Sequence, residues 1–317
     1  MKMLDIKNTD LKASNLVLGC MRIKELEPKA VEDLVRTAME VGINFFDHAD
    51  IYGGGACESY FSECIGMNPA LREKMIIQSK CGIRQGYYDF SKEHIIASVN
   101  ESLKRLKTEY LDVLLLHRPD TLMEPEEVAE AFDELHSSGK VRYFGVSNHN
   151  PMQVELLQKY INQKLVFNQL QFGPAHTPMV DSGMTVNMKT KQSINFEGSV
   201  LEYCLLKDMT IQTWSPFQKS NKMVPPYEEK YLFLGTFLGD MENYGELNRY
   251  IHGLAKKYDV TDTAIVAAWI LRHPANMQVI LGTTNKQRVI DAAAGSEISL
   301  TREEWYGMYK AAGNLIP

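Results

Sequence analysis

The chain of 317 residues predicts an α/β fold, a (β/α)8 TIM barrel, from three observations. Short apolar segments alternate with segments that repeat apolar residues at helical spacing, and this alternation occurs eight times. The apolar segments, such as LDVLLL at 111–116, are almost continuous runs, which is typical of parallel strands covered on both faces. An alternating segment at 2–14 comes first and predicts an N-terminal β-hairpin that caps the floor of the barrel.

Each repeat is expected to contain one strand followed by a helix. Ser91 is the expected N-cap of the third helix, and Thr301 with Glu304 forms a capping box that opens a last helix. The predicted strands are 16–19, 43–46, 75–79, 111–116, 141–146, 165–170, 210–214 and 278–281. The predicted helices are 29–41, 57–66, 91–106, 125–138, 151–161, 198–207, 245–257, 262–273 and 286–294.

A doubly wound sheet is the rival α/β architecture, and it needs a Gly-rich fingerprint after its first strand. Neither LGCMR at 18–22 nor GGG at 53–55 has the required spacing. No linker, repeat or low-complexity segment divides the chain, so residues 1–317 are predicted to form a single domain. Two long connections, 172–197 and 217–244, are expected to be ordered flaps over the C-terminal mouth. Their apolar residues include Met179, Met184, Met188, Tyr227, Tyr231, Phe233 and Phe237.

Composition limits the classes of function. An apolar content of 44% supports a full hydrophobic core, and a net charge of −6 argues against nucleic acid or an anionic membrane as a partner. The start of the chain lacks a signal-peptide core, and no apolar run has membrane-spanning length, so a cytoplasmic protein is expected. Five cysteines without a CxxC pair argue against a disulfide framework and a zinc site, so we expect no metal.

Titratable side chains follow three predicted strands at their C-terminal ends. Asp47 and Tyr52 come after 43–46, Lys80 follows 75–79, and His117 follows 111–116. Each alone has an ordinary explanation, such as a turn cap, a half-buried tyrosine or a hydrogen-bonded core histidine. Because all strands of a barrel run in the same direction, however, these ends surround one opening. Their convergence there predicts an active site.

The segment GINFFDHADIYGGGACE at 42–58 resembles the signature of the aldo-keto reductases. IIQSKCG at 76–82 and LLLHRPD at 114–120 resemble the segments that carry this family's strand-three lysine and strand-four histidine. The resemblance implies a (β/α)8 barrel, a small-molecule carbonyl substrate and an NADP cofactor. The catalytic tetrad that it implies is Asp47, Tyr52, Lys80 and His117.

Four more segments, GVSNH, NQLQF, WSPF and LGTTNKQR, resemble the family's cofactor-binding segments. The cofactor-binding residues that the resemblance implies are Gly19, Met21, Arg22 and Asp47; Ser147, Asn148 and Gln169 at the nicotinamide carboxamide; Trp214 as the plate behind the ring; Ser215, Pro216 and Phe217 at the pyrophosphate; and Gly282, Thr283, Thr284, Asn285, Arg288 and Asp291 at the adenosine end.

The segment 281–288 also predicts which dinucleotide is used. Arg288 can offer a planar fork of donors to a 2′-phosphate. Gly282 stands where NADP-specific relatives often carry lysine, so one cation is missing and the preference is reduced. No acidic residue in this segment can bind a ribose diol, and Asp291 is assigned to the adenine amino group. We therefore expect NADPH over NADH, by a modest ratio.

The implied activity is reduction of an aldehyde or ketone to an alcohol by hydride transfer from NADPH. Tyr52 is the expected general acid, and the cation of Lys80 is expected to lower its pKa from the usual value of about 10. Asp47 would keep Lys80 charged, and His117 would donate to the carbonyl oxygen. His48 stands where many relatives carry threonine, and a structural hydrogen bond is expected for it.

Two alternatives remain. The first is a non-enzymatic, cofactor-binding subunit of the same fold that regulates a partner protein, as the family's potassium-channel β subunits do. The second is a barrel hydrolase or aldolase with Lys80 as a Schiff base, which leaves Tyr52, Asn148 and Trp214 without a role. Since only about 20 residues follow the last barrel helix, an open substrate site is expected.

Overall fold

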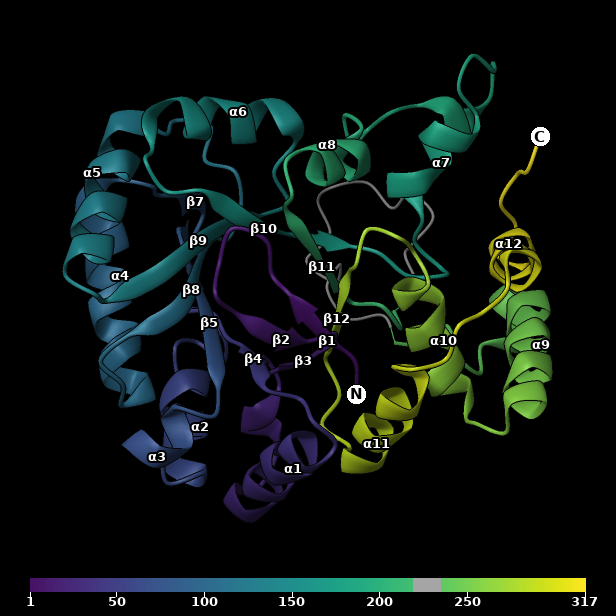
Figure 1. The fold of residues 1–317 in the computed structure, drawn as a ribbon, viewed down its shortest axis with the longest axis horizontal. Coiled ribbons are helices and arrows are strands. Elements are labelled where there is room, and N and C mark those ends of the chain that lie inside the picture. The colour runs from purple at the N-terminus through teal and green to yellow at the C-terminus, as the bar shows by residue number, and fades with distance from the viewer. Residues whose placement is uncertain (219–234) are drawn as a thin grey trace.

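The structure is a computed structural model that describes residues 1–218 and 235–317, and these residues form a closed parallel barrel (Figure 1). Each barrel strand pairs in parallel with the next one along the chain, and β12 pairs with β3 to complete the ring. The predicted (β/α)8 fold is confirmed. The barrel strands are β3 (Leu16–Gly19), β4 (Phe45–Asp47), β5 (Ile76–Cys81), β8 (Leu111–Leu116), β9 (Val141–Ser147), β10 (Leu165–Gln171), β11 (Thr210–Trp214) and β12 (Gln278–Leu281).

Helices connect the strands and surround the barrel in Figure 1. In α1, Val31, Leu34, Val35 and Ala38 are buried at the i, i+3, i+4, i+7 spacing of one helix face, which packs toward the strands. The helices are α1 (Pro28–Glu40), α2 (Cys57–Cys64), α3 (Pro69–Arg72), α4 (Lys92–Leu106), α5 (Pro125–Ser137), α6 (Pro151–Tyr160), α7 (Pro178–Met184), α8 (Val200–Leu206), α9 (Met241–Tyr258), α10 (Asp262–Leu271), α11 (Lys286–Gly295) and α12 (Arg302–Ala311), with short 3-10 turns η1 (Ile23–Glu25) and η2 (Lys191–Ser193).

Side-chain caps determine where several helices begin. The hydroxyl of Ser91 accepts from the backbone of α4, and Thr301 forms the predicted capping box with Glu304 at α12. The prediction for α9 was four residues short at its start. Asp240 caps this helix at Asn243, and a non-helical Tyr244 then interrupts the apolar periodicity from which the start had been predicted.

The N-terminal hairpin of β1 (Met3–Asp5) and β2 (Lys12–Ser14) closes one end of the barrel, as predicted. Its buried side chains form a cluster with residues near the beginnings of the strands, which are oriented into the barrel. The cluster includes Leu4, Ile6, Leu11, Val17, Phe45, Val113 and Val166. With this end filled, the opposite end remains as the mouth.

The connection 172–197 is an ordered flap that contains α7 and η2, with Met179 buried against the core. Phe237, from the other long connection, is also buried. Tyr227, Tyr231 and Phe233 lie outside the described residues. A small hairpin of β6 (Ile83–Arg84) and β7 (Tyr87–Tyr88) is not predicted from the sequence, because two-residue strands leave no periodic pattern.

In the two described ranges, no helix is long and apolar enough to cross a membrane. The same ranges contain no group of three or more His, Cys, Asp or Glu side chains arranged to hold a metal ion.

Candidate active site

Asp47, Lys80 and Tyr52 form a continuous chain of hydrogen bonds inside the mouth. The ammonium of Lys80 donates to the carboxylate of Asp47 at 2.8 Å, to the phenolic oxygen of Tyr52 at 3.0 Å and to the backbone oxygen of His48 at 2.7 Å. All three donors of the ammonium are therefore used, and Lys80 and Asp47 are both buried. The structure brings together the three residues that the sequence places on two different strands.

The turn after β4 presents Tyr52 to Lys80. Gly53, Gly54 and Gly55 all have positive φ angles, a conformation that side chains other than glycine rarely adopt. A Cβ atom on Gly53 would also lie 2.7 Å from the sulfur of Cys57. The GGG sequence thus reverses the chain tightly between Tyr52 and α2, which explains why it follows the tyrosine directly.

The pKa of Tyr52 corrects one expectation. Burial raises this pKa above its ordinary value, and the opposing effect of the Lys80 cation is smaller. For Lys80, burial is the largest effect and opposes the charge, but the Asp47 carboxylate and the Tyr52 phenol together outweigh it and raise the pKa. The prediction that Lys80 brings the tyrosine pKa below about 10 is therefore wrong for this structure. Tyr52 keeps its proton and Lys80 keeps its charge at neutral pH.

His117 lies across from Tyr52 at the end of β8, with 5.9 Å between the two ring centres. Burial, together with the charge of Lys80, lowers the pKa of His117 well below its ordinary value. The imidazole is therefore neutral at physiological pH. A neutral imidazole next to a phenol can donate one hydrogen bond to a ligand oxygen placed between them.

A network of buried glutamines also donates hydrogen bonds to Asp47. This network is not predicted from the sequence. Gln78 and Gln169 both donate to Asp47, at 2.6 and 3.0 Å, and both donate to Gln212. Gln212 in turn donates to Gln278 at 3.0 Å. The available signal was a glutamine inside four different apolar strand runs. Because these residues are far apart in sequence, only closure of the barrel shows that they meet.

His48 makes no side-chain hydrogen bond within residues 1–218 and 235–317, so the expected structural hydrogen bond is wrong. Both ring nitrogens are buried without a partner among the residues that the structure describes. The ring packs edge-on against Phe61, with 4.6 Å between the two ring centres. Burial lowers the pKa of His48 to about 3, so it stays neutral. The residue acts here as an aromatic core side chain.

A second group of charges lies behind the turn that carries Tyr52. Glu58 is fully buried and accepts from Arg105 at 2.7 Å and from Ser79 at 2.6 Å. Asp50 lies nearby, with one carboxylate oxygen buried and without a partner in the described ranges. Burial, reinforced by the Glu58 carboxylate, raises the pKa of Asp50 to about 7.

Asp50→Asn should stabilise the protein more at pH 8 than at pH 5. The folded pKa of about 7 lies above the ordinary value of 3.8, so the wild type loses stability as the pH rises from 4 through 7. The loss amounts to at most roughly 4 kcal/mol, and asparagine avoids it. Urea unfolding at both pH values measures the difference. Asp89→Asn is the control of opposite sign, because two hydrogen bonds from Ser91, together with the charges of His94 and Arg84, outweigh burial and lower the pKa of Asp89.

The residues predicted for the nicotinamide lie together on β9, β10 and β11. Asn148, at a φ of 59°, donates to Ser147 at 2.8 Å and accepts from the indole of Trp214 at 3.1 Å. Ser147 donates to the backbone oxygen of Gln169 at 3.0 Å. Since the side-chain nitrogen of Gln169 already donates to Asp47 and Gln212, its oxygen is the atom left for a ligand.

The residues predicted for the pyrophosphate follow β11. Ser215 has a φ of 51°, a left-handed conformation that turns the chain sharply after Trp214. Pro216 then approaches the flap so closely that a Cβ on Gly173 would lie 2.4 Å from its carbonyl oxygen. Phe217 packs against the core. The turn and the flap therefore fit together only because residue 173 is glycine.

The adenosine end shows one unexpected contact. The guanidinium of Arg22, from the turn after β3, donates to the backbone oxygen of Gly282 and lies 3.7 Å from where a Cβ of Gly282 would be. The Arg22 cation therefore lies beside Gly282, the position at which the sequence lacks a lysine. The side chain of Asn285 caps α11 by accepting from Gln287 and Arg288, so these two N–H groups are already used.

The remaining predicted residues lie at β3 and the turn after it, and between β12 and α11 or in α11 itself. Thr283 accepts from the backbone of Asn285, and Asp291 accepts from Gln287 at 3.0 Å. Met21 accepts from the thiol of Cys57. Gly19 pairs with Asp47 in the barrel, where an added Cβ would lie 3.0 Å from Ile280. Thr284 is partly exposed beside Thr283.

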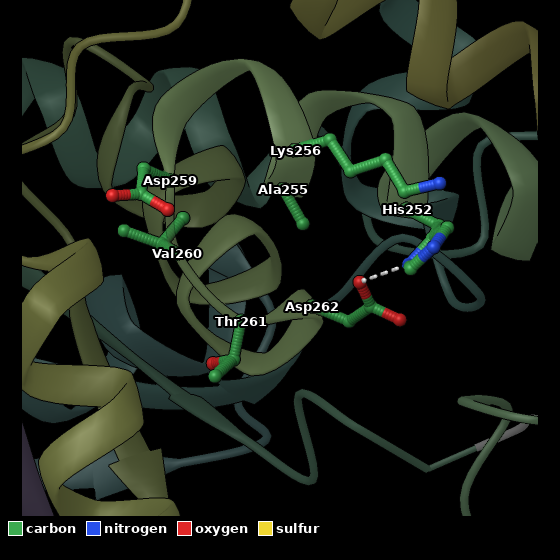
Figure 2. A pocket seen from close by; sticks show the side chains of 7 residues that line it. All are labelled: His252, Ala255, Lys256, Asp259, Val260, Thr261 and Asp262. Atoms are coloured by element: carbon green, nitrogen blue, oxygen red, sulfur yellow. Dashed lines mark hydrogen bonds and ion pairs between the residues drawn. The ribbon is translucent and has the colours of Figure 1, made fainter.

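A surface pocket at the junction of α9 and α10 lies apart from these residues (Figure 2). His252 and Asp262, 3.3 Å apart, are paired across it. None of the residues predicted for the active site lines this pocket, so it is separate from the candidate site. The lining residues are His252, Ala255, Lys256, Asp259, Val260, Thr261 and Asp262.

Comparisons with known proteins agree with this architecture. The chain is 34% identical to the uncharacterized oxidoreductase YcsN of Bacillus subtilis (strain 168), covering 95% of both proteins. It is 33% identical to the 6-dehydroglucose reductase of Agrobacterium fabrum, again over 95% of each. Among solved structures, a thermostable aldo-keto reductase in complex with the inhibitor epalrestat matches with a TM-score of 0.73 and 23% identity, covering 98% of this chain and 100% of that one.

The family model for the aldo/keto reductase family matches residues 15–311, which include every barrel strand. This range also contains all the residues of the Asp47–Lys80–Tyr52 chain and His117. The protein therefore belongs to the aldo/keto reductase family of NAD(P)H-dependent, carbonyl-reducing oxidoreductases.

Proposed function

We propose that this protein reduces an aldehyde or ketone to an alcohol with NADPH, and that Tyr52 is the general acid. The observation that carries the proposal is the buried chain of hydrogen bonds from Asp47 through Lys80 to Tyr52, which ends beside His117. When bound, the reduced nicotinamide supplies the hydride. The carbonyl oxygen of the substrate then needs a proton, and the phenol of Tyr52 is the donor.

The pKa shifts support this assignment of roles. Burial keeps the proton on Tyr52 until a stronger base, the developing alkoxide, takes it. The phenolate that remains lies 3.0 Å from the ammonium of Lys80, which stabilises its charge. Asp47 keeps Lys80 charged and orients its ammonium toward the oxygen of Tyr52. Neutral His117 donates a hydrogen bond that orients the carbonyl oxygen.

The residues at the mouth fit a dinucleotide. The free oxygen of Gln169 and the side chains of Ser147 and Asn148 complement the donor and acceptor of a carboxamide. The indole of Trp214 offers a flat face for an aromatic ring. Because the indole of Trp214 is hydrogen-bonded to Asn148, the carboxamide-binding groups and the indole form one preorganised surface. We further propose that residues 1–317 act as a single domain around this surface.

NADPH is proposed over NADH because two arginines lie at the adenosine end. Arg288, in the first turn of α11, can offer a planar fork of donors to the 2′-phosphate. Arg22 places a second cation over Gly282, where lysine is absent. The ratio in favour of NADPH is thus expected to exceed the one that Arg288 alone would give.

Arg288→Ala should raise KM for NADPH about tenfold and leave KM for NADH almost unchanged, since only NADP carries the 2′-phosphate. Arg22→Ala should have a similar selective effect. Steady-state kinetics with both cofactors, and cofactor titration without substrate, measure these changes. Arg302→Ala, at the start of α12, is the matched control for loss of an arginine. Equal damage to both cofactors, or better use of NADH by the wild type, would overturn the assignment.

A panel of aldehydes and ketones tests the function itself, with consumption of NADPH and NADH followed by absorbance. The proposal expects turnover of several simple aldehydes, with NADPH the better reductant. If both cofactors bind but neither supports turnover, the chemistry is wrong and the non-enzymatic subunit is favoured. Borohydride trapping with candidate ketones separates the Schiff-base alternative, because only that alternative gives a covalent adduct on Lys80.

A further inference from the structure

Arg118 lies at the mouth of the barrel, directly after His117. Its guanidinium carbon lies 5.7 Å from the centre of the Trp214 ring, on the face of the indole. The side chain is partly buried, and burial lowers its pKa, but a guanidinium keeps its charge at neutral pH. The phenols of Tyr88 and Tyr52 act on it electrostatically, and its charge in turn helps to lower the pKa of His117 and of His149. A cation therefore stands between the tyrosine, the imidazole and the indole of the proposed active site.

Among the residues that the structure describes, this cation has no anionic partner. In residues 1–218 and 235–317, no carboxylate pairs with Arg118 and no hydrogen-bond acceptor meets its guanidinium. Among other partly or fully buried arginines, Arg72 pairs with Asp112 at 2.7 Å and Arg105 with Glu58 at 2.7 Å, whereas Arg22 and Arg272 donate to backbone oxygens. Even the exposed Arg84 pairs with Asp89. Arg118 therefore differs from these arginines, because each of them has an acceptor for its guanidinium in the described part of the chain.

A partly desolvated charge without a partner is costly for the free protein. An incoming anion would offset that cost, and a carboxylate matches the planar fork of a guanidinium with two parallel hydrogen bonds. The face of the Trp214 indole, against which the guanidinium lies, would shield such a pair in part from water and salt. Retaining an unpaired arginine here makes physical sense if the ligand supplies the negative charge.

We propose that Arg118 binds an anionic group of the substrate, so that the preferred substrates are aldehydes or ketones that carry a carboxylate. The inference rests on the proposed function, because it places the reducible carbonyl between Tyr52 and His117. Those two rings lie 5.9 Å apart, and Arg118 is the next residue along the chain from His117. The carbonyl and the carboxylate can therefore belong to one small molecule.

Matched substrate pairs test the inference. The substrates are 3- and 4-carboxybenzaldehyde and their methyl esters, which keep the aldehyde and the ring and remove the charge. For each pair, the ratio of kcat/KM for the acid to kcat/KM for the ester is measured in the wild type, Arg118→Met, Arg118→Lys and Arg84→Met. Comparing one ratio across variants cancels the intrinsic reactivity of each aldehyde.

The wild type should favour the acid over the ester by about tenfold or more in at least one pair. Arg118→Met should lower that ratio about 10- to 100-fold, which is what a charge-assisted hydrogen bond contributes. Arg118→Lys should retain part of the ratio, since it keeps the charge but loses the fork. Arg84→Met, which removes a paired arginine from the neighbouring hairpin, should retain the wild-type ratio.

Three results would overturn the inference. The first is the same ratio in the wild type and Arg118→Met. The second is a rise in KM for NADPH in Arg118→Met with no change in the ratio, which would assign Arg118 to the cofactor phosphates. The third is a wild type that prefers D-glyceraldehyde to all four probes, which would indicate a neutral hydroxylated substrate.

Failure of the proposed function looks different, because the wild type would then reduce neither the acids nor the esters. Calorimetric binding of the alcohol products, 4-carboxybenzyl alcohol and its methyl ester, to the complex with NADP⁺ gives the same comparison without turnover. Thermal melting of Arg118→Met shows whether the variant is folded. If it does not fold, Arg118→Lys and the binding comparison in the wild type still decide the question.

Discussion

Tyr52→Phe is expected to lower the rate of carbonyl reduction by about 10²- to 10⁴-fold, the usual contribution of a general acid. The substitution removes the phenolic oxygen that accepts from Lys80 at 3.0 Å and keeps the ring that packs against His117. The proton donor is lost while the shape of the mouth is preserved. Steady-state kcat with a simple aldehyde and NADPH measures the effect.

Cofactor binding should survive this change, so quenching of tryptophan fluorescence by NADPH is the internal control. Tyr87→Phe, on the exposed hairpin strand β7, controls for the loss of a hydroxyl elsewhere near the mouth. Because burial raises the pKa of Tyr52, reduction by the wild type should show no falling limb below about pH 10. Near wild-type turnover in Tyr52→Phe would show that another group donates the proton.

Lys80→Met is expected to cost as much activity as Tyr52→Phe, and the double variant should be little worse than either single one. Lys80 acts through its hydrogen bond to the phenol and its ion pair with Asp47, so the three residues work as one unit. Groups that act as a unit lose activity non-additively. Rate losses that multiply in the double variant would mean that Lys80 and Tyr52 contribute independently.

Lys80→Met should also destabilise the fold, because it leaves the buried carboxylate of Asp47 without its cation. Removing one partner of a buried ion pair costs about 3–5 kcal/mol. Asp47→Asn combined with Lys80→Met removes both charges and should recover much of that loss without restoring turnover. Urea unfolding of the two variants, measured beside kcat, separates the structural from the catalytic role of the lysine.

The barrel could be predicted closely because parallel strands leave a local signal. The runs at 111–116, 210–214 and 278–281 coincide with β8, β11 and β12. In β8 and β12 the apolar residues are almost contiguous because these strands are buried on both faces. Where the local signal is short or interrupted, the prediction failed. The two-residue strands β6 and β7 were missed, and Tyr244 hid the start of α9.

The candidate site was predicted in part for the same reason. The order of Asp47, Tyr52, Lys80 and His117 at strand ends was visible, because a barrel brings all such ends to one opening. The glutamine network was not visible. Gln78, Gln169, Gln212 and Gln278 meet only when the strands close into a ring, and nothing local requires them to bond to one another.

The sequence by itself determined which chemistry-bearing residues this chain carries and the strand end at which each stands. The tertiary structure decided what surrounds them. Burial, which depends on every packed neighbour, outweighs Lys80 and raises the pKa of Tyr52. Closure of the barrel places Arg22 over Gly282, and within the described ranges the arrangement of the mouth leaves Arg118 without a carboxylate. Residue type and order are local properties, whereas desolvation and pairing arise between segments that only folding brings together.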